Sequence, residues 1–161
     1  MTSPTAAQWL GMLLVTEAAR PAERPAWVPI CWVVRNRVAI PRRFRSTVEG
    51  VVLQPRQFSR FNDWSHHLEE GGPDAVWDAA CAWSTSKHLD PLRSEAERVA
   101  AEVLAAPIAS RPFGPLVLHY YSPVSMRPAF SRPSWWADEI AREVPIAGVN
   151  PSDFRFGESH G

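Results

Sequence analysis

The residue with the clearest chemical potential in this chain is Glu17, which lies in the apolar segment 9–20. If this segment forms a helix, Leu10, Leu13 and Glu17 share one face, because residues three or four positions apart are neighbours. A carboxyl group on an apolar stripe loses hydration, which favours its protonated form. A carboxylic acid that keeps its proton near neutral pH is suited to general acid catalysis. The alternative is that Glu17 lies at the edge of the stripe, reaches solvent and pairs with Arg20.

Composition and charge limit the classes of protein to which the chain can belong. It has 161 residues, of which 45% are hydrophobic and 21% are charged, as is typical of one globular domain spanning residues 1–161. The formal net charge is zero, so we expect no nucleic-acid partner. No apolar stretch approaches the length of a membrane span, and no export leader of the usual kind is seen. We therefore expect no signal peptide and no membrane insertion, and we also expect a monomer.

The cysteine and histidine pattern gives no indication of a metal site. Cys31 and Cys81 both lie in apolar surroundings and are either two buried thiols, which we favour, or one disulfide. The pair His66 and His67 stands in a polar stretch, which we interpret as a loop, and no zinc-type spacing is present. We expect neither a metal nor a cofactor.

Hydrophobic periodicity and the positions of the prolines predict a mainly helical α+β fold with a small β element. The predicted helices span residues 6–19, 27–40, 47–53, 73–87, 94–106 and 134–144, with a loop at 20–25 and an irregular or short-stranded segment at 54–65. Ser94 with Glu97 matches the capping box, and Ser134 is expected to cap the last helix. Residues 116–121 are expected to form a strand or a buried loop, and residues 154–156 a closing strand.

Four short segments follow one another in a fixed order: 16–20 (TEAAR), 33–38 (VVRNRV), 51–59 (VVLQPRQFS) and 118–123 (LHYYSP). They resemble the motifs GEARGE, VILNRV, VIYQPGQFS and FYNP of the SleB-type cell wall hydrolases, the family of the spore cortex-lytic enzymes. A tryptophan-containing stretch follows the last motif, as it does in that family. The resemblance extends over residues 9–156, nearly the whole chain.

The chain departs from the family pattern at three points. The loop after Glu17 is one residue longer, the family's second glutamate is displaced to Glu23, and Ser122 replaces the asparagine before proline. These departures affect fine contacts with the substrate more than the reaction itself.

The resemblance implies a lysozyme-like domain, similar to lytic transglycosylases, which cleaves peptidoglycan glycan strands between N-acetylmuramic acid and N-acetylglucosamine. Glu17 matches the family's catalytic glutamate. The resemblance also implies a cleft that is lined by Gln57, Phe58, Ser59 and Tyr120 or Tyr121.

Each of these residues has a binding role and a purely structural alternative. Gln57 and Ser59 either hydrogen-bond sugar groups or belong to turns and helix caps. A hydroxyl from Tyr120 or Tyr121 either orients Glu17 and stabilises developing charge, or belongs to a buried ring.

Two further residues complete the candidate set. Phe58 is expected to pack beneath the floor of the cleft. His119 is interpreted as either a ligand-facing residue or a core histidine whose hydrogen bonds are satisfied.

The sequence is compatible with two mechanisms of glycan cleavage, hydrolysis and lytic transglycosylation. A hydrolase needs a second carboxylate, for which Asp63 and Glu23 are the candidates, although Asp63 is also explained as a residue that caps local backbone. A lytic transglycosylase needs only one glutamate as acid and base, because the 6-hydroxyl of the sugar attacks and leaves a 1,6-anhydro end. We favour the transglycosylase.

The biological setting is inferred from the same pattern. We expect a phage lysin that reaches the bacterial cell wall through the phage lysis machinery or as part of a virion, with a bacterial protein of non-standard export as the alternative. A non-catalytic wall-binding or virion structural protein is the competing function.

Overall fold

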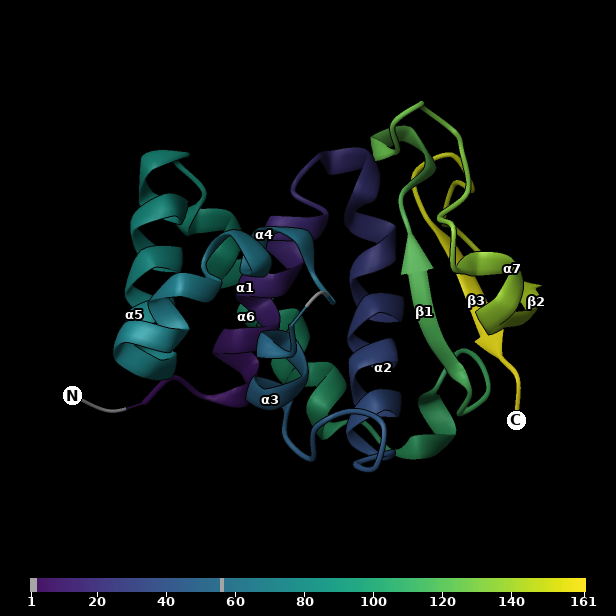
Figure 1. Ribbon diagram of the computed structural model, residues 1–161, viewed down its shortest axis with the longest axis horizontal. Helices are drawn as coiled ribbons and strands as arrows, with labels where there is room; N and C mark the ends of the chain where they lie inside the picture. Colours follow the sequence, from purple (N-terminus) through teal and green to yellow (C-terminus); the bar gives the residue numbers. More distant parts are fainter. Residues whose placement is uncertain (1–2, 56) are drawn as a thin grey trace.

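The computed structural model describes residues 3–55 and 57–161, and it has helices at one end and a small sheet at the other (Figure 1). The helices are α1 (Ala6–Glu17), α2 (Trp27–Val38), α3 (Val48–Leu53), α4 (Ser59–Asp63), α5 (Ser65–Ser86), α6 (Asp90–Ala105) and α7 (Trp136–Glu139). Short 3-10 helices span Pro21–Ala26, Ile108–Ser110 and Pro123–Ser125, and the strands are β1 (Val117–Tyr121), β2 (Ile140–Val144) and β3 (Arg155–Ser159). The mainly helical α+β class predicted from the sequence is confirmed.

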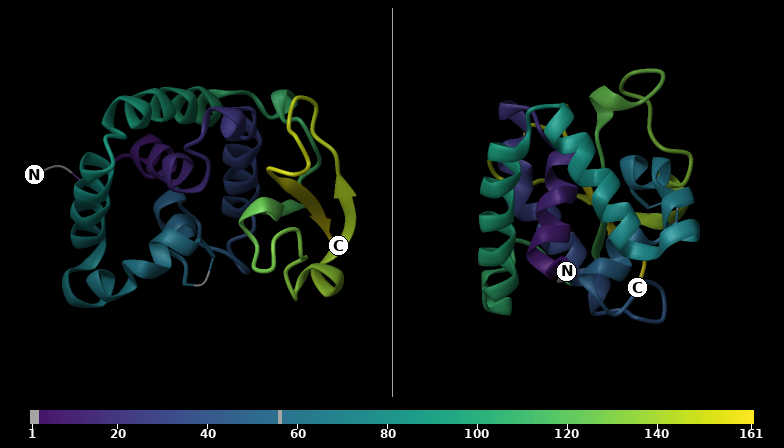
Figure 2. Two further views of the ribbon diagram at one scale, coloured as in Figure 1. Left: turned by 90° about the horizontal axis from the view of Figure 1, so that it is seen from above. Right: turned by 90° about the vertical axis from the view of Figure 1, so that its left-hand side faces the viewer.

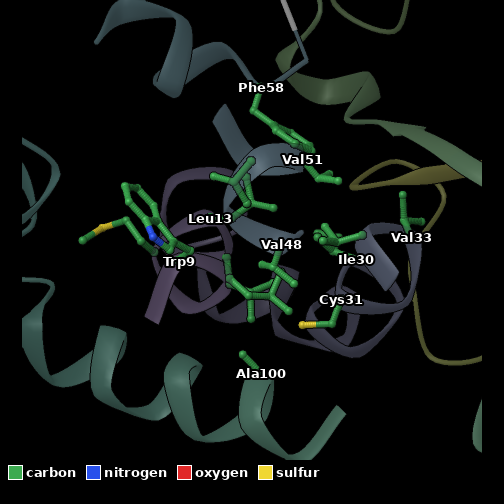
Figure 3. Packing of buried hydrophobic residues seen from close by; sticks show 14 of the residues in the cluster. Trp9, Leu13, Ile30, Cys31, Val33, Val48, Val51, Phe58 and Ala100 are labelled. Atoms are coloured by element: carbon green, nitrogen blue, oxygen red, sulfur yellow. The ribbon is translucent and has the colours of Figure 1, made fainter. Parts of the chain in front are cut away.

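Helix α1 forms the centre of the helical part. It contacts α6, α3 and α2, and α6 also packs on α2 (Figure 2). The core contains Trp9 and Leu13 of α1, Ile30 of α2, Val51 of α3 and Ala100 of α6 (Figure 3). Because α1 is covered on most sides, its apolar run is continuous rather than confined to one stripe.

Helices α1 and α6 approach each other closely where Gly11 faces Glu97. A Cβ atom added to Gly11 would lie 2.8 Å from the backbone nitrogen of Glu97. We predict that Gly11→Ala lowers the free energy of unfolding by about 2 kcal/mol, because α6 has to move away from α1. Urea unfolding measures this change. The matched control is Gly114→Ala, whose new Cβ would lie 3.6 Å from a Glu158 oxygen, an ordinary contact, and an equal loss in both variants would contradict the prediction.

The end of α1 is fixed by residues that follow it. Thr5 and Gln8 form a capping box at its beginning, and Glu17 is its last residue. The indole nitrogen of Trp27 donates a 2.9 Å hydrogen bond to the carbonyl oxygen of Ala18. The predicted loop at 20–25 is a short 3-10 helix, because Pro21 and Pro25 fit a tight turn but not a longer α-helix.

Several predicted boundaries were wrong. The segment 54–65 contains α4, and α5 begins at Ser65, so His66 and His67 are helical rather than in a loop. By contrast, the predicted start at residue 73 is confirmed, because α5 consists of two helices joined at a kink: Gly72 adopts a φ of 73° that glycine tolerates, and Pro73 follows in the first turn of the second helix.

Two later helix predictions were also wrong, one in its start and cap and the other in its extent. Helix α6 begins at Asp90, with a proline in its first turn, so Ser94 lies inside the helix and caps nothing. The predicted helix 134–144 is the single turn of α7 followed by strand β2.

Within the described residues, the strands form a three-stranded antiparallel sheet in the order β1-β3-β2. Tyr120 of β1 pairs with Phe156 of β3, which also pairs with Val144 of β2. Helix α2 packs against β1, and the Asn36 side chain donates hydrogen bonds of 3.1 Å to the carbonyls of Gly114 and Val117. The sheet is thereby attached to the helical part.

The cysteines do not form a disulfide. Cys31 is buried in the core and Cys81 is half-buried, and both are free thiols, as favoured from the sequence. Burial raises the pKa of the Cys31 thiol far above its ordinary value, so it stays neutral.

Among the helices of residues 3–55 and 57–161, none combines the length and the hydropathy that a transmembrane span requires.

Candidate active site

An open cleft of about 670 Å³ lies between the helical part and the sheet. The helical part contributes Thr16, Glu17, Arg37, Arg43, Gln57, Phe58 and Ser59. The sheet and the segment after β1 contribute His119, Tyr120, Tyr121, Ser122, Ser125, Met126, Pro133, Trp135 and Glu139. Residues that are distant in the sequence therefore meet along one groove.

Glu17 is a carboxylic acid whose pKa lies close to neutral pH. It is the last residue of α1, half-buried, with its side chain in the cleft wall. Burial raises the pKa of Glu17 to about 7, the positive charge of Arg37 opposes this rise, and the negative charge of Glu23 adds to it. The predicted alternative, an ion pair with Arg20, is not formed, because Arg20 pairs with Glu23 at 3.1 Å.

Arg37 is a buried cation at the base of the cleft. Its Nε donates to the carbonyl of Leu118 at 2.8 Å, and Nη1 donates to Oε1 of Gln57 at 2.9 Å. Its guanidinium group lies over the rings of Phe44 and Phe58, at 4.9 Å and 5.2 Å from their centres. Burial lowers the pKa of Arg37 to about 10, so the group remains charged at neutral pH.

A chain of polar groups connects Arg37 to the outer part of the cleft. The Nδ1 atom of His119 lies 3.5 Å from Nη2 of Arg37, and its Nε2 lies 3.2 Å from both Arg43 Nη2 and Glu139 Oε1. Burial and the neighbouring arginines lower the pKa of His119 to about 4, despite the opposing charge of Glu139. His119 is therefore neutral at pH 7.

Glu139 remains ionised within this chain. Partial burial favours its neutral form, but hydrogen bonds from Arg43 and Ser159 and the charge of Arg43 lower its pKa overall. Arg43 also forms an ion pair with this carboxylate. Arg37, Arg43 and Glu139 were not among the site residues predicted from the sequence. Arg37 is the second arginine of the VVRNRV segment, and Arg43 belongs to the basic cluster Arg42, Arg43 and Arg45, which the sequence indicated to be a solvated loop.

Aromatic side chains form the wall next to Glu17. Phe58 is buried, lines the cleft and stacks on Tyr120 with ring centres 6.4 Å apart. The Tyr120 hydroxyl is buried and has no hydrogen-bond partner in the described part of the chain. Burial, followed by the charge of Glu17, raises the pKa of Tyr120 well above its ordinary value. The Tyr121 ring packs edge-on against Trp136 at 4.9 Å.

The structure brings together most of the residues selected from the sequence. Glu17 shares the cleft with Gln57, Phe58, Ser59, His119, Tyr120 and Tyr121. Asp63 is not among the described residues that line it, and its exposed carboxylate pairs with Arg60 at 3.4 Å. Glu23 is buried outside the cleft lining and accepts a 3.1 Å hydrogen bond from the backbone nitrogen of Arg20. Neither candidate second carboxylate therefore faces the groove.

Sequence comparison assigns the chain to a family. Residues 23–147 match the cell wall hydrolase family, and the chain belongs to this family, which is the SleB-type family whose motifs it resembles. Comparison with curated proteins and with solved structures gave no match. Membership identifies an enzyme class that acts on the bacterial cell wall, with peptidoglycan as the implied substrate. The matched range begins after Glu17, so the role of this residue rests on the geometry of the cleft.

Proposed function

We propose that this protein cleaves the glycan strands of peptidoglycan between N-acetylmuramic acid and N-acetylglucosamine, as a lytic transglycosylase with Glu17 as its acid and base. The observation that carries the proposal is the raised pKa of Glu17, about 7, in the wall of a cleft that is large enough for sugar rings. Such a group is protonated in a large fraction of molecules at neutral pH and can donate its proton to a leaving oxygen.

In this mechanism, the Glu17 carboxyl protonates the glycosidic oxygen while the bond from that oxygen to the anomeric carbon breaks. The 6-hydroxyl of the same muramic acid residue then bonds to the anomeric carbon, and the Glu17 carboxylate takes up the hydroxyl proton. The products are a 1,6-anhydro end and a new free hydroxyl on the neighbouring sugar. No water is consumed, and Glu17 returns to its protonated form.

The arrangement of carboxylates supports this mechanism over hydrolysis. Among the described residues that line the cleft, the carboxylates are Glu17 and Glu139. The Oε1 atom of Glu139 is engaged by Arg43, His119 and Ser159, so this oxygen is held in place and is not available to attack or to activate water. A hydrolase would need a carboxylate that is available to activate water or to attack.

Mass spectrometry of the muropeptides released by the purified protein tests the proposal. Products that end in 1,6-anhydromuramic acid support it, whereas reducing ends, heavier by one water, contradict it and point to Glu139 as the second carboxylate. If no muropeptides are released from walls that the protein binds, the non-catalytic wall-binding function is the better explanation.

We further predict that Asp63→Asn retains activity within about twofold of the wild type. The reason is that Asp63 is exposed, pairs with Arg60 and is not among the described residues of the cleft; surface pairs of this kind contribute about 0 to 1 kcal/mol. The loss of turbidity of a cell-wall suspension measures the rate. A loss of a hundredfold or more would assign Asp63 a direct part in the reaction.

A further inference from the structure

The cleft has an exposed aromatic residue at its outer edge. Trp135 lines the cleft, yet 41% of its surface is exposed, whereas the adjacent Trp136 is buried. Trp136 packs on Tyr121 and Ile140 in a small second core and anchors the segment. The two neighbouring tryptophans thus have different surroundings. Packing in the second core accounts for the presence of Trp136, but it does not account for an exposed tryptophan at position 135.

Trp135 lies close to polar groups because it is one helical turn away from Glu139. The backbone nitrogen of Glu139 donates a 3.0 Å hydrogen bond to the carbonyl oxygen of Trp135, so these residues lie one turn apart at α7. Both of them contact His119, whose ring centre lies 5.3 Å from the Trp135 ring and whose Nε2 lies 3.2 Å from the Glu139 carboxylate. An indole ring and a carboxylate that is held in place therefore contact the same histidine side chain.

Arg43 adds fixed hydrogen-bond donors to this group. It contacts both His119 and Glu139 and is 42% exposed in its side chain. Trp135, His119, Arg43 and Glu139 form what we call the outer cluster. The flat apolar ring provides contact area, while the guanidinium and carboxylate groups provide donors and acceptors whose positions are fixed.

A sugar ring has the surface that complements the outer cluster. Its C–H face is apolar and fits an indole ring, whereas its hydroxyl and N-acetyl groups project from the edge and need polar partners. We propose that the outer cluster is a subsite that binds an N-acetylhexosamine ring of the glycan strand away from the bond that is cleaved, with the sugar stacked on Trp135. This inference rests on the proposed function, because it takes the glycan strand to be the substrate.

A binding experiment tests the subsite separately from catalysis. The Glu17→Gln protein is used as the parent so that the ligand is not cleaved, and the probes are insoluble peptidoglycan and peptide-free N-acetylglucosamine oligomers. We expect Trp135→Ala to weaken binding to both probes about tenfold, equivalent to about 1.4 kcal/mol. Trp135→Phe should retain part of the affinity because it keeps a ring.

The same segment offers a matched control. Phe130 is 61% exposed and is not among the described residues of the cleft, so Phe130→Ala should bind like the parent. In otherwise wild-type protein, Trp135→Ala should raise KM about tenfold and change kcat little, because Trp135 contacts the strand away from the reacting atoms.

The outcomes separate the two proposals. If Trp135→Ala binds both probes as the parent does, the subsite is wrong while the assignment of Glu17 stands. If binding to peptidoglycan falls but binding to the peptide-free oligomers does not, Trp135 contacts the stem peptide and the sugar subsite is again wrong. If the parent binds neither probe, both proposals fail.

Discussion

Glu17→Gln is expected to reduce the rate of cell-wall clearing at least about a thousandfold, because the substitution removes the transferable proton and keeps the shape of the side chain. The matched control is Glu97→Gln. Glu97 is also a partly buried carboxyl whose pKa is raised by burial, but it lies against Gly11 between α1 and α6, away from the described cleft residues. The control should clear walls at nearly the wild-type rate.

The same variant changes the pH dependence of stability. The pKa of Glu17 is about 7 in the folded protein against an ordinary value of 4.5, so the folded state binds this proton more tightly than the unfolded state. The contribution of Glu17 to stability is therefore greatest below pH 4.5 and falls as the pH rises to about 7.

Glutamine does not titrate, so Glu17→Gln should lack this loss. Its melting temperature relative to the wild type should be higher at pH 8 than at pH 4. If the melting temperatures of the variant and the wild type change equally between pH 4 and pH 8, Glu17 is not the buried acid. The same conclusion follows if the variant clears cell walls at the wild-type rate.

Local patterns were sufficient for the site residues that lie in short motifs. The apolar run around Glu17 indicated a buried helix, and burial of this helix by its neighbours is what raises the pKa of the carboxyl group. Segment 51–59 brings Gln57 and Phe58 into the cleft, because α3 packs against α2, whose Arg37 donates to Gln57, and because Phe58 stacks on Tyr120 of β1.

The side of the cleft formed by the sheet and α7 depends on contacts between residues that are distant in the sequence, which local sequence patterns do not predict. Arg43 and Glu139 are 96 residues apart, and they meet because β2 joins the sheet beside β3. The segment 134–144 was predicted as a helix because its residues have helical spacing. Pairing of β2 with β3 overrides that local preference after a single turn and sets Glu139 at the end of α7. The same pairing determines where Trp135 and Glu139 lie relative to His119.

Arg37→Met is expected to reduce the clearing rate about a hundredfold and to lower the free energy of unfolding by about 2 kcal/mol. The substitution leaves the Leu118 carbonyl and the Gln57 side chain without the donor that holds them, and this lowers stability and disturbs the cleft. Loss of the desolvation cost of a buried cation offsets part of the change. Urea unfolding measures the stability, and turbidity measures the rate.

The pH profile of Arg37→Met separates the charge of this residue from its hydrogen bonds. A general acid works only while it is protonated, so the wild-type rate should fall as the pH rises through about 7, the pKa of Glu17. The positive charge of Arg37 lowers that pKa, so removing it should move this decline to higher pH. Arg37→Lys keeps a charge but loses the planar set of donors, so its rate should fall while the decline stays near the wild-type pH. If the decline in Arg37→Met does not move, the charge of Arg37 does not act on the acid, and its part in the site is confined to holding Gln57 and β1 in place.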